Sequence, residues 1–109
     1  MKKIISTISP FASLVYSATK QIPRGRISTY GAIAQAIGRP QAARAVGQAL
    51  NHNPYWPTVP CHRVVGSTGQ LTGFATGLNK KRQLLQKEGI TIKKDHVLNF
   101  AQVFYQPHL

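Results

Sequence analysis

A single cysteine lies within the segment Pro60-Cys61-His62-Arg63-Val64-Val65 of this 109-residue chain. A thiol reacts as its thiolate, so a nucleophilic cysteine needs a cationic or proton-accepting neighbour. Cys61 has one of each kind, because His62 and Arg63 follow it directly. The alternative is a lone cysteine that packs as a small buried hydrophobe. The two neighbours favour a nucleophile whose proton is taken by the imidazole.

An acidic side chain offers a second group for chemistry. Glu88 follows a segment at 78–87 whose apolar spacing predicts a helix, and it shares the helix face that carries Lys81 and two leucines. A carboxylate at a helix C-terminus opposes the helix dipole, so we expect a tertiary partner for it. Two partners fit: Lys81 in a structural ion pair, which the local sequence favours, or His62, whose tautomer the carboxylate would fix.

Three short helices are predicted before the cysteine. In the first, apolar residues recur at helical spacing, namely Phe11, Leu14, Val15, Ala18 and Ile22. The second helix is capped by Ser28 or Thr29 and ends at Gly38. The third runs from Pro40 to about Asn51, since proline is tolerated in the first turn of a helix. Its inward positions are Ala43, Val46 and Leu50.

The second and third helices, joined by a glycine-containing turn, are typical of a helix-turn-helix. The outer face of the third helix consists of small or polar residues: Gln41, Arg44, Ala45, Gln48 and Asn51. Ala45 and Gly47 would let the backbone approach a nucleic-acid groove closely. The alternative is that these helices simply pack against a neighbour, and the net charge of the chain favours groove binding.

The segment that leads to the cysteine is expected to be a rigid loop. Prolines at 54, 57 and 60 fix dihedral angles and remove hydrogen-bond donors. Val64-Val65 predicts a short buried strand, and 66–69 predicts a turn. A further loop at 73–77 is rich in small residues, which suits the wall of a narrow pocket.

Composition limits the fold. The length and the hydrophobic share of 42% fit one domain over 1–109, with a core at about 11–90 and a C-terminal tail at 91–109. We expect a mainly α fold with a helix-turn-helix (winged-helix-like) core and at most a short β element. One cysteine allows neither an intrachain disulfide nor a thiolate pair for structural zinc, which fits a reduced, intracellular setting. The first apolar stretch is too short for a signal sequence or a membrane span, so a soluble protein is expected.

The chain is strongly basic. Fourteen Lys and Arg stand against two acids, Glu88 and Asp95, and give a formal net charge of +12. Such an imbalance indicates a polyanionic partner, because each neutralised phosphate releases condensed counterions. Nucleic acid is the favoured partner, with acidic membrane surfaces and ribosomal RNA as the alternatives.

Four motifs, in order, resemble the O6-alkylguanine-DNA alkyltransferases, also called methylated-DNA-protein-cysteine methyltransferases. The segment 60–65 resembles the active-site motif of that family, and Ala-Ala-Arg-Ala-Val-Gly at 42–47 resembles its recognition helix. Asn53-Pro54 and Glu88-Gly89 lie at the family's distances before and after the cysteine. The resemblance covers about residues 11–90.

The resemblance implies direct repair of double-stranded DNA that contains O6-alkylguanine. The alkyl group would move irreversibly from guanine O6 to the protein's own cysteine, with no cofactor and no metal. It implies Cys61 as nucleophile and alkyl acceptor, His62 as the group that takes its proton through a bridging water, and Glu88 as the group that orients the imidazole. Asn53 would brace the active-site turn. Tyr30 would contact a phosphate beside the lesion and donate a hydrogen bond to the departing base. The alternative is that Tyr30 is simply a core residue.

The resemblance also implies contacts to DNA. Arg44 would enter the base stack in place of the flipped nucleotide, since the target carbon lies inside a duplex. Binding from the minor groove agrees with the thin face at Ala45 and Gly47. Further candidates for DNA contacts are Arg39, Gln41, Gln48 and Ser67, and those for the substrate pocket are Val64, Phe74 and Ala75. The alternative for Arg39 and Ser67 is that they are solvated residues of turns.

Some features depart from the family pattern. Many members carry an additional N-terminal domain, which we expect this chain to lack. The catalytic domain would then stand alone, as a monomer. Phe74 replaces a common tyrosine and Ala75 a serine found in some members, so fewer hydrogen bonds to the base are expected. Trp56 would either narrow the pocket or serve as a structural aromatic, and it is assigned to neither role.

Two other interpretations are open. Alkyltransferase-like proteins of this size bind alkylated guanine and recruit another repair pathway, but they lack the cysteine, and Cys61 argues against that assignment. A basic winged-helix regulator with an inert cysteine would instead bind DNA by its sequence. We expect no membrane partner, and a location in the cytoplasm with the nucleoid or, in a eukaryote, in the nucleus. The tail after Gly89 either packs on the domain or binds a partner.

Overall fold

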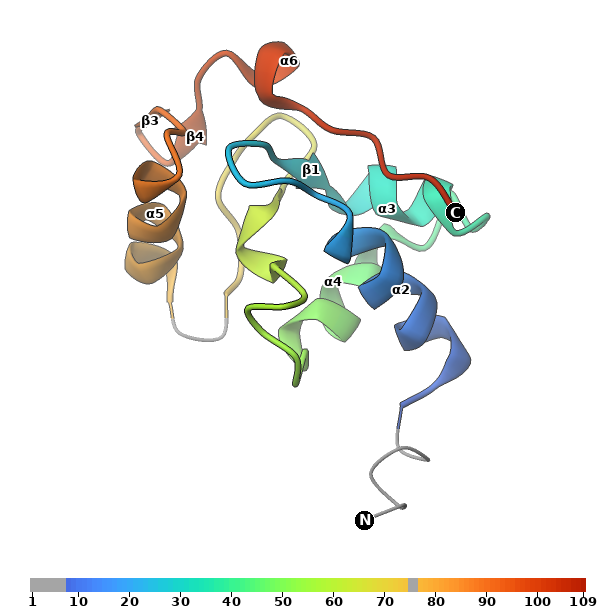
Figure 1. The fold of residues 1–109 in the computed structure, drawn as a ribbon. Helices are drawn as coiled ribbons and strands as arrows, with labels where there is room; N and C mark the ends of the chain where they lie inside the picture. Colours follow the sequence, from blue (N-terminus) through green and yellow to red (C-terminus); the bar gives the residue numbers. More distant parts are fainter. Residues whose placement is uncertain (1–7, 75–76) are drawn as a thin grey trace.

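The computed structural model describes residues 8–74 and 77–109, and its elements are short helices joined by loops (Figure 1). In chain order they are α2 (Pro10–Lys20), β1 (Ser28–Thr29), α3 (Tyr30–Ala36), α4 (Ala43–Asn51), the 3-10 turn η1 (Cys61–Arg63), β2 (Val64–Val65), α5 (Leu78–Lys87), β3 (Ile92–Lys93), β4 (His96–Val97) and α6 (Phe100–Val103). The expected mainly α fold is confirmed. Its β content is two pairs of two-residue strands rather than a single short element.

Helix α2 begins directly after a capping serine. The Ser9 hydroxyl accepts a hydrogen bond from the Ala12 amide at 3.0 Å, and Pro10 occupies the first turn. The buried side chains of the helix are Val15, Tyr16, Ala18 and Thr19. Leu14, expected in the core, is 41% exposed because the buried face is rotated toward Tyr16 and Thr19. That prediction was wrong by about one position around the helix.

Helices α3 and α4 form the predicted helix-turn-helix. Thr29 caps α3 by accepting a hydrogen bond from the Ala32 amide at 3.0 Å, and Gly38 follows the helix with a φ of +78°, a conformation that favours glycine. Helix α4 starts at Ala43, so the expected start at Pro40 was wrong. The preceding residues instead form a turn, in which the Ala42 amide donates to the Arg39 carbonyl.

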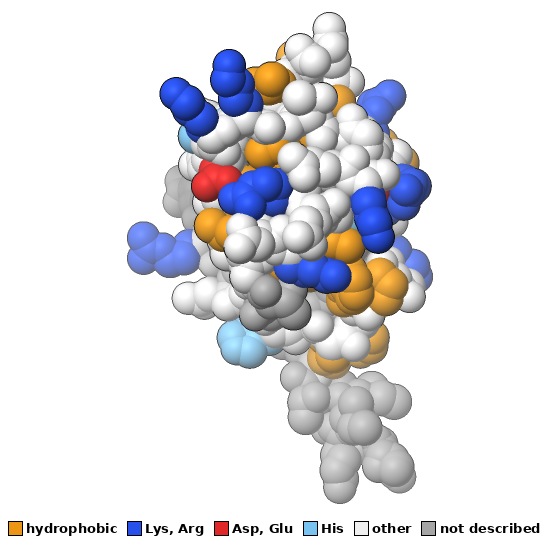
Figure 2. Space-filling model, turned by 90° about the vertical axis from the view of Figure 1, so that its left-hand side faces the viewer, with side chains coloured by type: hydrophobic (Ala, Val, Ile, Leu, Met, Phe, Trp, Pro, Cys, Tyr) orange, Lys and Arg blue, Asp and Glu red, His pale blue; other side chains and the backbone are white. Residues whose placement is uncertain are grey.

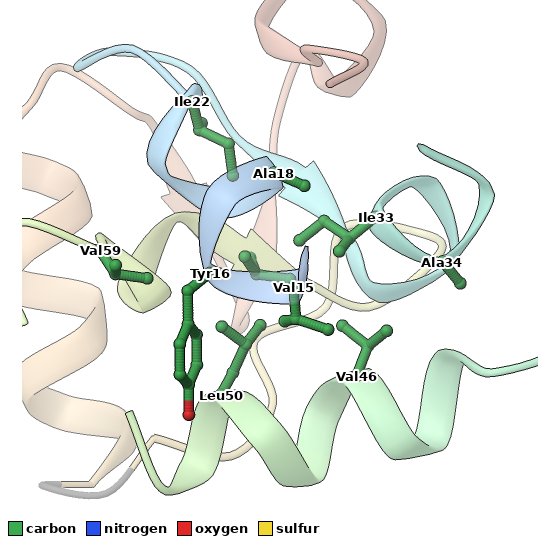
Figure 3. Packing of buried hydrophobic residues seen from close by; sticks show 10 residues of the cluster. Val15, Tyr16, Ala18, Ile22, Ile33, Ala34, Val46, Leu50 and Val59 are labelled. Carbon is green, nitrogen blue, oxygen red and sulfur yellow. The ribbon is translucent and has the colours of Figure 1, made fainter. Parts of the chain in front are cut away.

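The first core cluster lies where α2, α3 and α4 meet. Val15 of α2, Ile33 of α3, and Val46 and Leu50 of α4 point toward one another (Figure 3). All four are 5% exposed or less. Burial of each such side chain contributes about 1.5–3 kcal/mol, so this contact fixes α4 relative to the rest of the domain.

A short parallel pairing of β1 with β2 joins the helix-turn-helix to the cysteine loop. Thr29 lies opposite Val65, so Tyr30, which opens α3, is held beside the strand that follows Cys61. A second apolar cluster covers this pairing from the side of α5. Its buried members are Ile27, Val65, Leu71, Leu85, Ile90 and Val97.

The C-terminal tail packs on the domain. The Ile27 amide donates to the Val103 carbonyl at 2.9 Å, and the Tyr105 amide donates to the Ile27 carbonyl at 2.7 Å. The Phe100 and Phe104 rings stack at 5.5 Å over the second cluster. Of the two alternatives left open by the sequence, packing on the domain is therefore the one observed.

Candidate active site

Cys61 opens the one-turn helix η1 at the end of the proline-containing loop. Asn53 braces this loop from within, because its side-chain amide donates to the Val59 carbonyl at 2.8 Å and its side-chain oxygen accepts from the Tyr55 amide at 2.9 Å. Val59 and Pro60 are buried immediately before the cysteine. The side chain of Asn53 therefore connects two parts of the loop that precedes the thiol.

Cys61 is only partly buried. Burial raises the pKa of the thiol above its usual 9.0, while the Asn53 amide, the Lys81 charge and the local backbone amide act in the opposite direction. At neutral pH the net effect keeps the group in its thiol form. A reaction at this sulfur therefore requires a base to accept its proton.

His62 is buried beside the thiol and is held by Glu88. The Nε2 atom of the imidazole lies 2.9 Å from Oε2 of the carboxylate. Burial lowers the pKa of His62 below its usual 6.5, and the charges of Arg63 and Lys81 act in the same direction, whereas Glu88 raises it. The net result is a neutral imidazole at neutral pH, which is the form that can accept a proton.

Arg63 supplies the second partner of Glu88. Its Nε and one terminal nitrogen each donate to one carboxylate oxygen at 2.9 Å, and its other terminal nitrogen donates to the Ile22 carbonyl at 2.8 Å. Burial raises the pKa of Glu88, but the hydrogen bonds from Arg63 and His62 outweigh it, so the pKa lies below its usual 4.5. The carboxylate is therefore ionised and fixed in orientation.

Lys81 is fully buried and does not pair with Glu88. Its ammonium group donates to the Val64 carbonyl at 2.6 Å and to the Thr72 carbonyl at 2.7 Å. Burial lowers the pKa of this group to about 8. The local preference for a Lys81–Glu88 pair was wrong, because the lysine bridges β2 to the loop at 72–73 while Glu88 turns to the imidazole.

Tyr30 is the first residue of α3 and lines the same recess as Cys61. Its hydroxyl accepts a hydrogen bond from the Thr72 hydroxyl at 2.9 Å, which leaves its own proton available to another acceptor. Burial raises the pKa of Tyr30, and the proximity of Cys61 adds to the rise. Tyr30 is only half-buried, so it is not a plain core residue.

A recess at the cysteine shares four lining residues with a wider groove. A recess of about 10 Å³ is lined by Tyr30, Gly47, Leu50, Asn51, Cys61, Gly73 and Phe74. It adjoins a groove of about 480 Å³ lined by Tyr30, Ala43, Arg44, Gly47, Gln48, Asn51, Gly66, Gln70, Thr72 and Gly73. The recess has room for roughly one water molecule. A larger group can enter the recess only if part of its lining moves.

The structure brings some of the predicted residues to these hollows. Arg44 and Gln48 line the groove and are exposed, and Phe74 lines the recess. Val64 is fully buried, and its carbonyl rather than its side chain contributes by accepting from Lys81.

Other predicted residues lie elsewhere. Ala45 is exposed next to a separate hollow with Ser9 and His52, and Ser67 is exposed in the turn after β2. Arg39 and Gln41 border a shallow hollow at the turn before α4, where the Arg39 guanidinium lies 5.9 Å from the Phe11 ring centre. Ala75 lies outside the described residues.

Sequence reasoning did not assign two contacts of the site: the pairing of Arg63 with Glu88 and a hydrogen bond from Trp56. The indole Nε1 of Trp56 donates to Nδ1 of His62 at 3.0 Å, and the two rings meet edge to face at 5.9 Å. Phe74 completes an aromatic group with both rings at 6.4 Å. No local pattern signals this contact, because Trp56 belongs to an irregular loop whose path is set by prolines.

The face of the molecule drawn in Figure 2 is basic. On the face shown in Figure 2, Lys and Arg side chains are distributed across the molecule rather than gathered in one patch, and acidic side chains are nearly absent. In the described ranges no three His, Cys, Asp or Glu side chains are grouped so that they could hold a metal ion. None of the helices described here has the length and hydropathy of a membrane span.

The sequence of the chain is similar to those of known proteins. Over residues 10–90 the chain matches the family model described as the DNA-binding domain of 6-O-methylguanine DNA methyltransferase. It is 54% identical over 79 residues to a methylated-DNA–protein-cysteine methyltransferase of Methanosarcina acetivorans, an alignment that covers 72% of this chain and 51% of the relative. The chain spans about half the length of the curated relatives it matches.

Two solved structures are similar in fold and sequence. Atl1 of S. pombe, in complex with damaged DNA containing O6-carboxymethylguanine, has a TM-score of 0.80 and 36% identity, with 89% of this chain and 95% of that chain covered. The OGT of Mycobacterium tuberculosis, in complex with DNA, has a TM-score of 0.72 and 51% identity, with 73% and 50% covered. Since the family model spans most of the chain and the relatives agree with it, the chain belongs to the 6-O-methylguanine DNA methyltransferase family.

Proposed function

We propose that this protein repairs O6-alkylguanine in double-stranded DNA by moving the alkyl group to Cys61. The observation that carries the proposal is the position of Cys61 in a recess that opens onto the groove of the helix-turn-helix, with His62 and Glu88 directly behind it. Once its lining moves apart, the recess offers an alkylated base access to Cys61, and the groove offers a surface for the duplex from which the base comes.

Binding to DNA is the first step. The net charge of +12 favours a polyanion, and the two similar structures named above are complexes with DNA. Arg44 is an exposed cation on the wall of the groove, beside Gly47, whose lack of a side chain keeps the backbone accessible. We assign Arg44 to the space that the flipped nucleotide leaves in the stack, with Gln48 as a neighbouring contact.

Alkyl transfer follows from the chemistry of the groups present. The thiol proton passes to Nδ1 of His62 through a water molecule, and Glu88 stabilises the imidazolium through Nε2. The thiolate attacks the alkyl carbon, so the S–C bond forms as the C–O6 bond breaks and its electron pair passes to the guanine. Tyr30 can donate a proton to the leaving base, because its hydroxyl already accepts from Thr72.

The product determines the kinetics. A thioether is stable, and the proton balance closes when the imidazolium returns the thiol proton to Tyr30, which has protonated the guanine, so the reaction uses neither a cofactor nor a metal. Each protein molecule therefore acts once. It acts wherever the genome lies, in the cytoplasm of a prokaryote or in the nucleus of a eukaryote.

A second candidate is a lesion sensor without alkyl transfer. The likeness to Atl1, which extends over 95% of that chain, favours it. The presence of Cys61 and about 50% identity to named methyltransferases favour the enzyme. Both functions predict binding to lesion duplexes, and they differ only at the sulfur.

Nucleoside analysis of the DNA separates the two candidates. A duplex with one O6-methylguanine is incubated with excess protein, digested and assayed for the lesion. Loss of O6-methylguanine with wild-type protein, and its persistence with Cys61→Ala, is the expected result. Persistence of the lesion with wild-type protein that still binds the duplex would identify a sensor.

A further inference from the structure

Both ring nitrogens of His62 are engaged in the structure. Nε2 lies 2.9 Å from the Glu88 carboxylate, and Nδ1 lies 3.0 Å from the indole nitrogen of Trp56. An indole nitrogen can only donate, so Nδ1 must accept, and the ring proton must reside on Nε2. The tautomer of His62 is thereby fixed from two sides.

This arrangement occupies the nitrogen that the reaction needs. If Nε2 carries the proton shared with Glu88, the thiol of Cys61 can be deprotonated only by the lone pair of Nδ1. That lone pair is the acceptor of the Trp56 hydrogen bond. The two hydrogen bonds that the structure gives the His62 ring go to Trp56 and Glu88, so neither reaches Cys61.

We propose, resting on the function proposed above, that Trp56 is a positioning residue that caps Nδ1 of His62 and must leave it before alkyl transfer. In the capped state the thiol keeps its proton. When the indole moves away, a water molecule takes its place at Nδ1, bridges to the sulfur and carries the thiol proton to the imidazole. No other bond changes in this step.

The surroundings of Trp56 give it room to move. The indole is 41% exposed and also borders a hollow of about 690 Å³ between α2 and the proline-containing loop. Tyr16, Ser17 and Thr58 are among the residues around this hollow. It contains neither Cys61 nor His62, so we assign it as space for the displaced ring rather than as the substrate pocket.

Phe74 links the cap to the substrate recess. Its ring lines the recess beside Cys61, and it meets the rings of Trp56 and His62 at 6.4 Å each. Because the recess of about 10 Å³ is too small for a base, an entering guanine must displace Phe74. That displacement removes one of the rings that hold the indole in place, so base entry and release of the imidazole are coupled.

Several charged groups face the imidazole besides the indole. Glu88, after α5, raises its pKa, while Arg63 of η1 and Lys81 of α5 lower it, and burial lowers it most. A hydrogen bond donated to Nδ1 also favours the neutral ring. Removing that donor while leaving the other groups in place therefore shifts the titration of His62 upward in pH.

The test is Trp56→Phe, which keeps an aromatic ring against His62 and Phe74 and deletes only the donor and part of the ring. Tyr55→Phe is the matched control, since it changes the adjacent exposed aromatic of the same loop by one polar group. Three quantities are measured for each protein: the NMR titration of the His62 ring nitrogens, the rate of Cys61 carboxamidomethylation by iodoacetamide, and the single-turnover transfer from an O6-methylguanine duplex.

The cap predicts that Trp56→Phe raises the pKa of His62 and moves the acid limb of the transfer rate upward by the same amount. At pH 8, both reactions of Cys61 become faster by about fivefold, the factor that corresponds to one ordinary hydrogen bond. Tyr55→Phe leaves all three quantities unchanged.

The opposite results overturn the proposal that Trp56 caps Nδ1 of His62. An unaltered His62 titration would show that Nδ1 is not capped in solution, and a slower transfer in a folded variant would show that the indole assists the imidazole. If neither wild type nor variant transfers methyl while the titration and the iodoacetamide rate still shift, the cap stands and the proposed alkyl transfer fails. The two proposals are thus tested separately.

Discussion

Glu88 and His62, 26 residues apart in the chain, are joined by a 2.9 Å hydrogen bond between a buried carboxylate and Nε2 of a buried imidazole. This contact connects the C-terminal end of α5 to the residue after the cysteine. It explains why an acid occupies a helix end where the helix dipole disfavours one. The carboxylate serves its tertiary partners, His62 and Arg63, rather than its own helix.

Glu88→Gln tests the link between this contact and the chemistry. We expect the alkyl-transfer rate to fall roughly 10- to 100-fold, because an amide no longer stabilises the imidazolium. Affinity for duplex DNA should stay within about twofold, since the side chain is buried away from the groove. Single-turnover transfer and fluorescence anisotropy measure the two quantities.

Asp95→Asn is the control for Glu88→Gln. It removes the other of the two acids in the chain, changes the net charge equally, and affects only an exposed pair with Arg82. Equal transfer rates for the two variants would leave Glu88 with a structural role only.

Arg44→Ala tests the role of the groove. The transfer rate from a lesion duplex should fall about tenfold or more, because no side chain replaces the flipped nucleotide, while affinity for undamaged duplex falls less than about threefold. Arg26→Ala, which removes an equally exposed charge outside the groove, should give only the smaller loss. If Arg44→Ala weakens binding to damaged and undamaged duplexes equally, the arginine is a general phosphate contact.

Lys81→Met tests the buried ammonium group. Methionine preserves the apolar length of the side chain but leaves the Val64 and Thr72 carbonyls without their donor. The free energy of unfolding should decrease by about 1–3 kcal/mol, whereas Lys80→Met, on the exposed side of α5, should change it by less than about 0.5 kcal/mol. Urea denaturation measures both, and equal stabilities would mean that water satisfies these carbonyls.

The pH dependence of stability follows from two lowered pKa values. The pKa of folded His62 lies below its usual 6.5, and that of folded Glu88 lies below its usual 4.5. Between the folded and the usual pKa of each group, the unfolded chain therefore binds more protons than the folded chain. The contribution of each group to stability is fully present when the pH is above its usual pKa. It is lost as the pH falls through the pKa of the group in the folded protein. Urea unfolding between pH 8 and pH 4 should show stability decreasing below about pH 6.5 and again below about pH 4.5. A stability that increases as the pH falls from 7 to 5 would contradict the assigned shifts.

The sequence was most informative where local rules decide the structure. The cap at Thr29 and the extent of α5 follow from hydrogen-bonding groups and apolar spacing near each position. The start of α4 was misplaced because proline permits a first helical turn but does not impose one, and the preceding residues form a turn instead. Leu14 was misplaced because apolar spacing defines a stripe but not its centre.

The contacts of the site were harder to predict because they join distant segments. The local sequence allowed two partners for Glu88 and favoured Lys81. In the structure Lys81 instead donates to the carbonyls of Val64 and Thr72, because of the way α5 packs. The family resemblance indicated His62 correctly as the neighbour of Glu88. Neither source indicated Trp56, because its contact with His62 depends on the path of an irregular loop.

The most direct test of alkyl transfer is the intact mass of the protein after incubation with a short duplex containing O6-methylguanine. Wild-type protein should gain one methyl group, about 14 Da, in proportion to the lesion supplied, and peptide mapping should place it on Cys61. Cys61→Ala should gain nothing. An unchanged wild-type mass, with the lesion duplex still bound in preference to undamaged DNA, would contradict alkyl transfer and show that the protein recognises the lesion without repairing it.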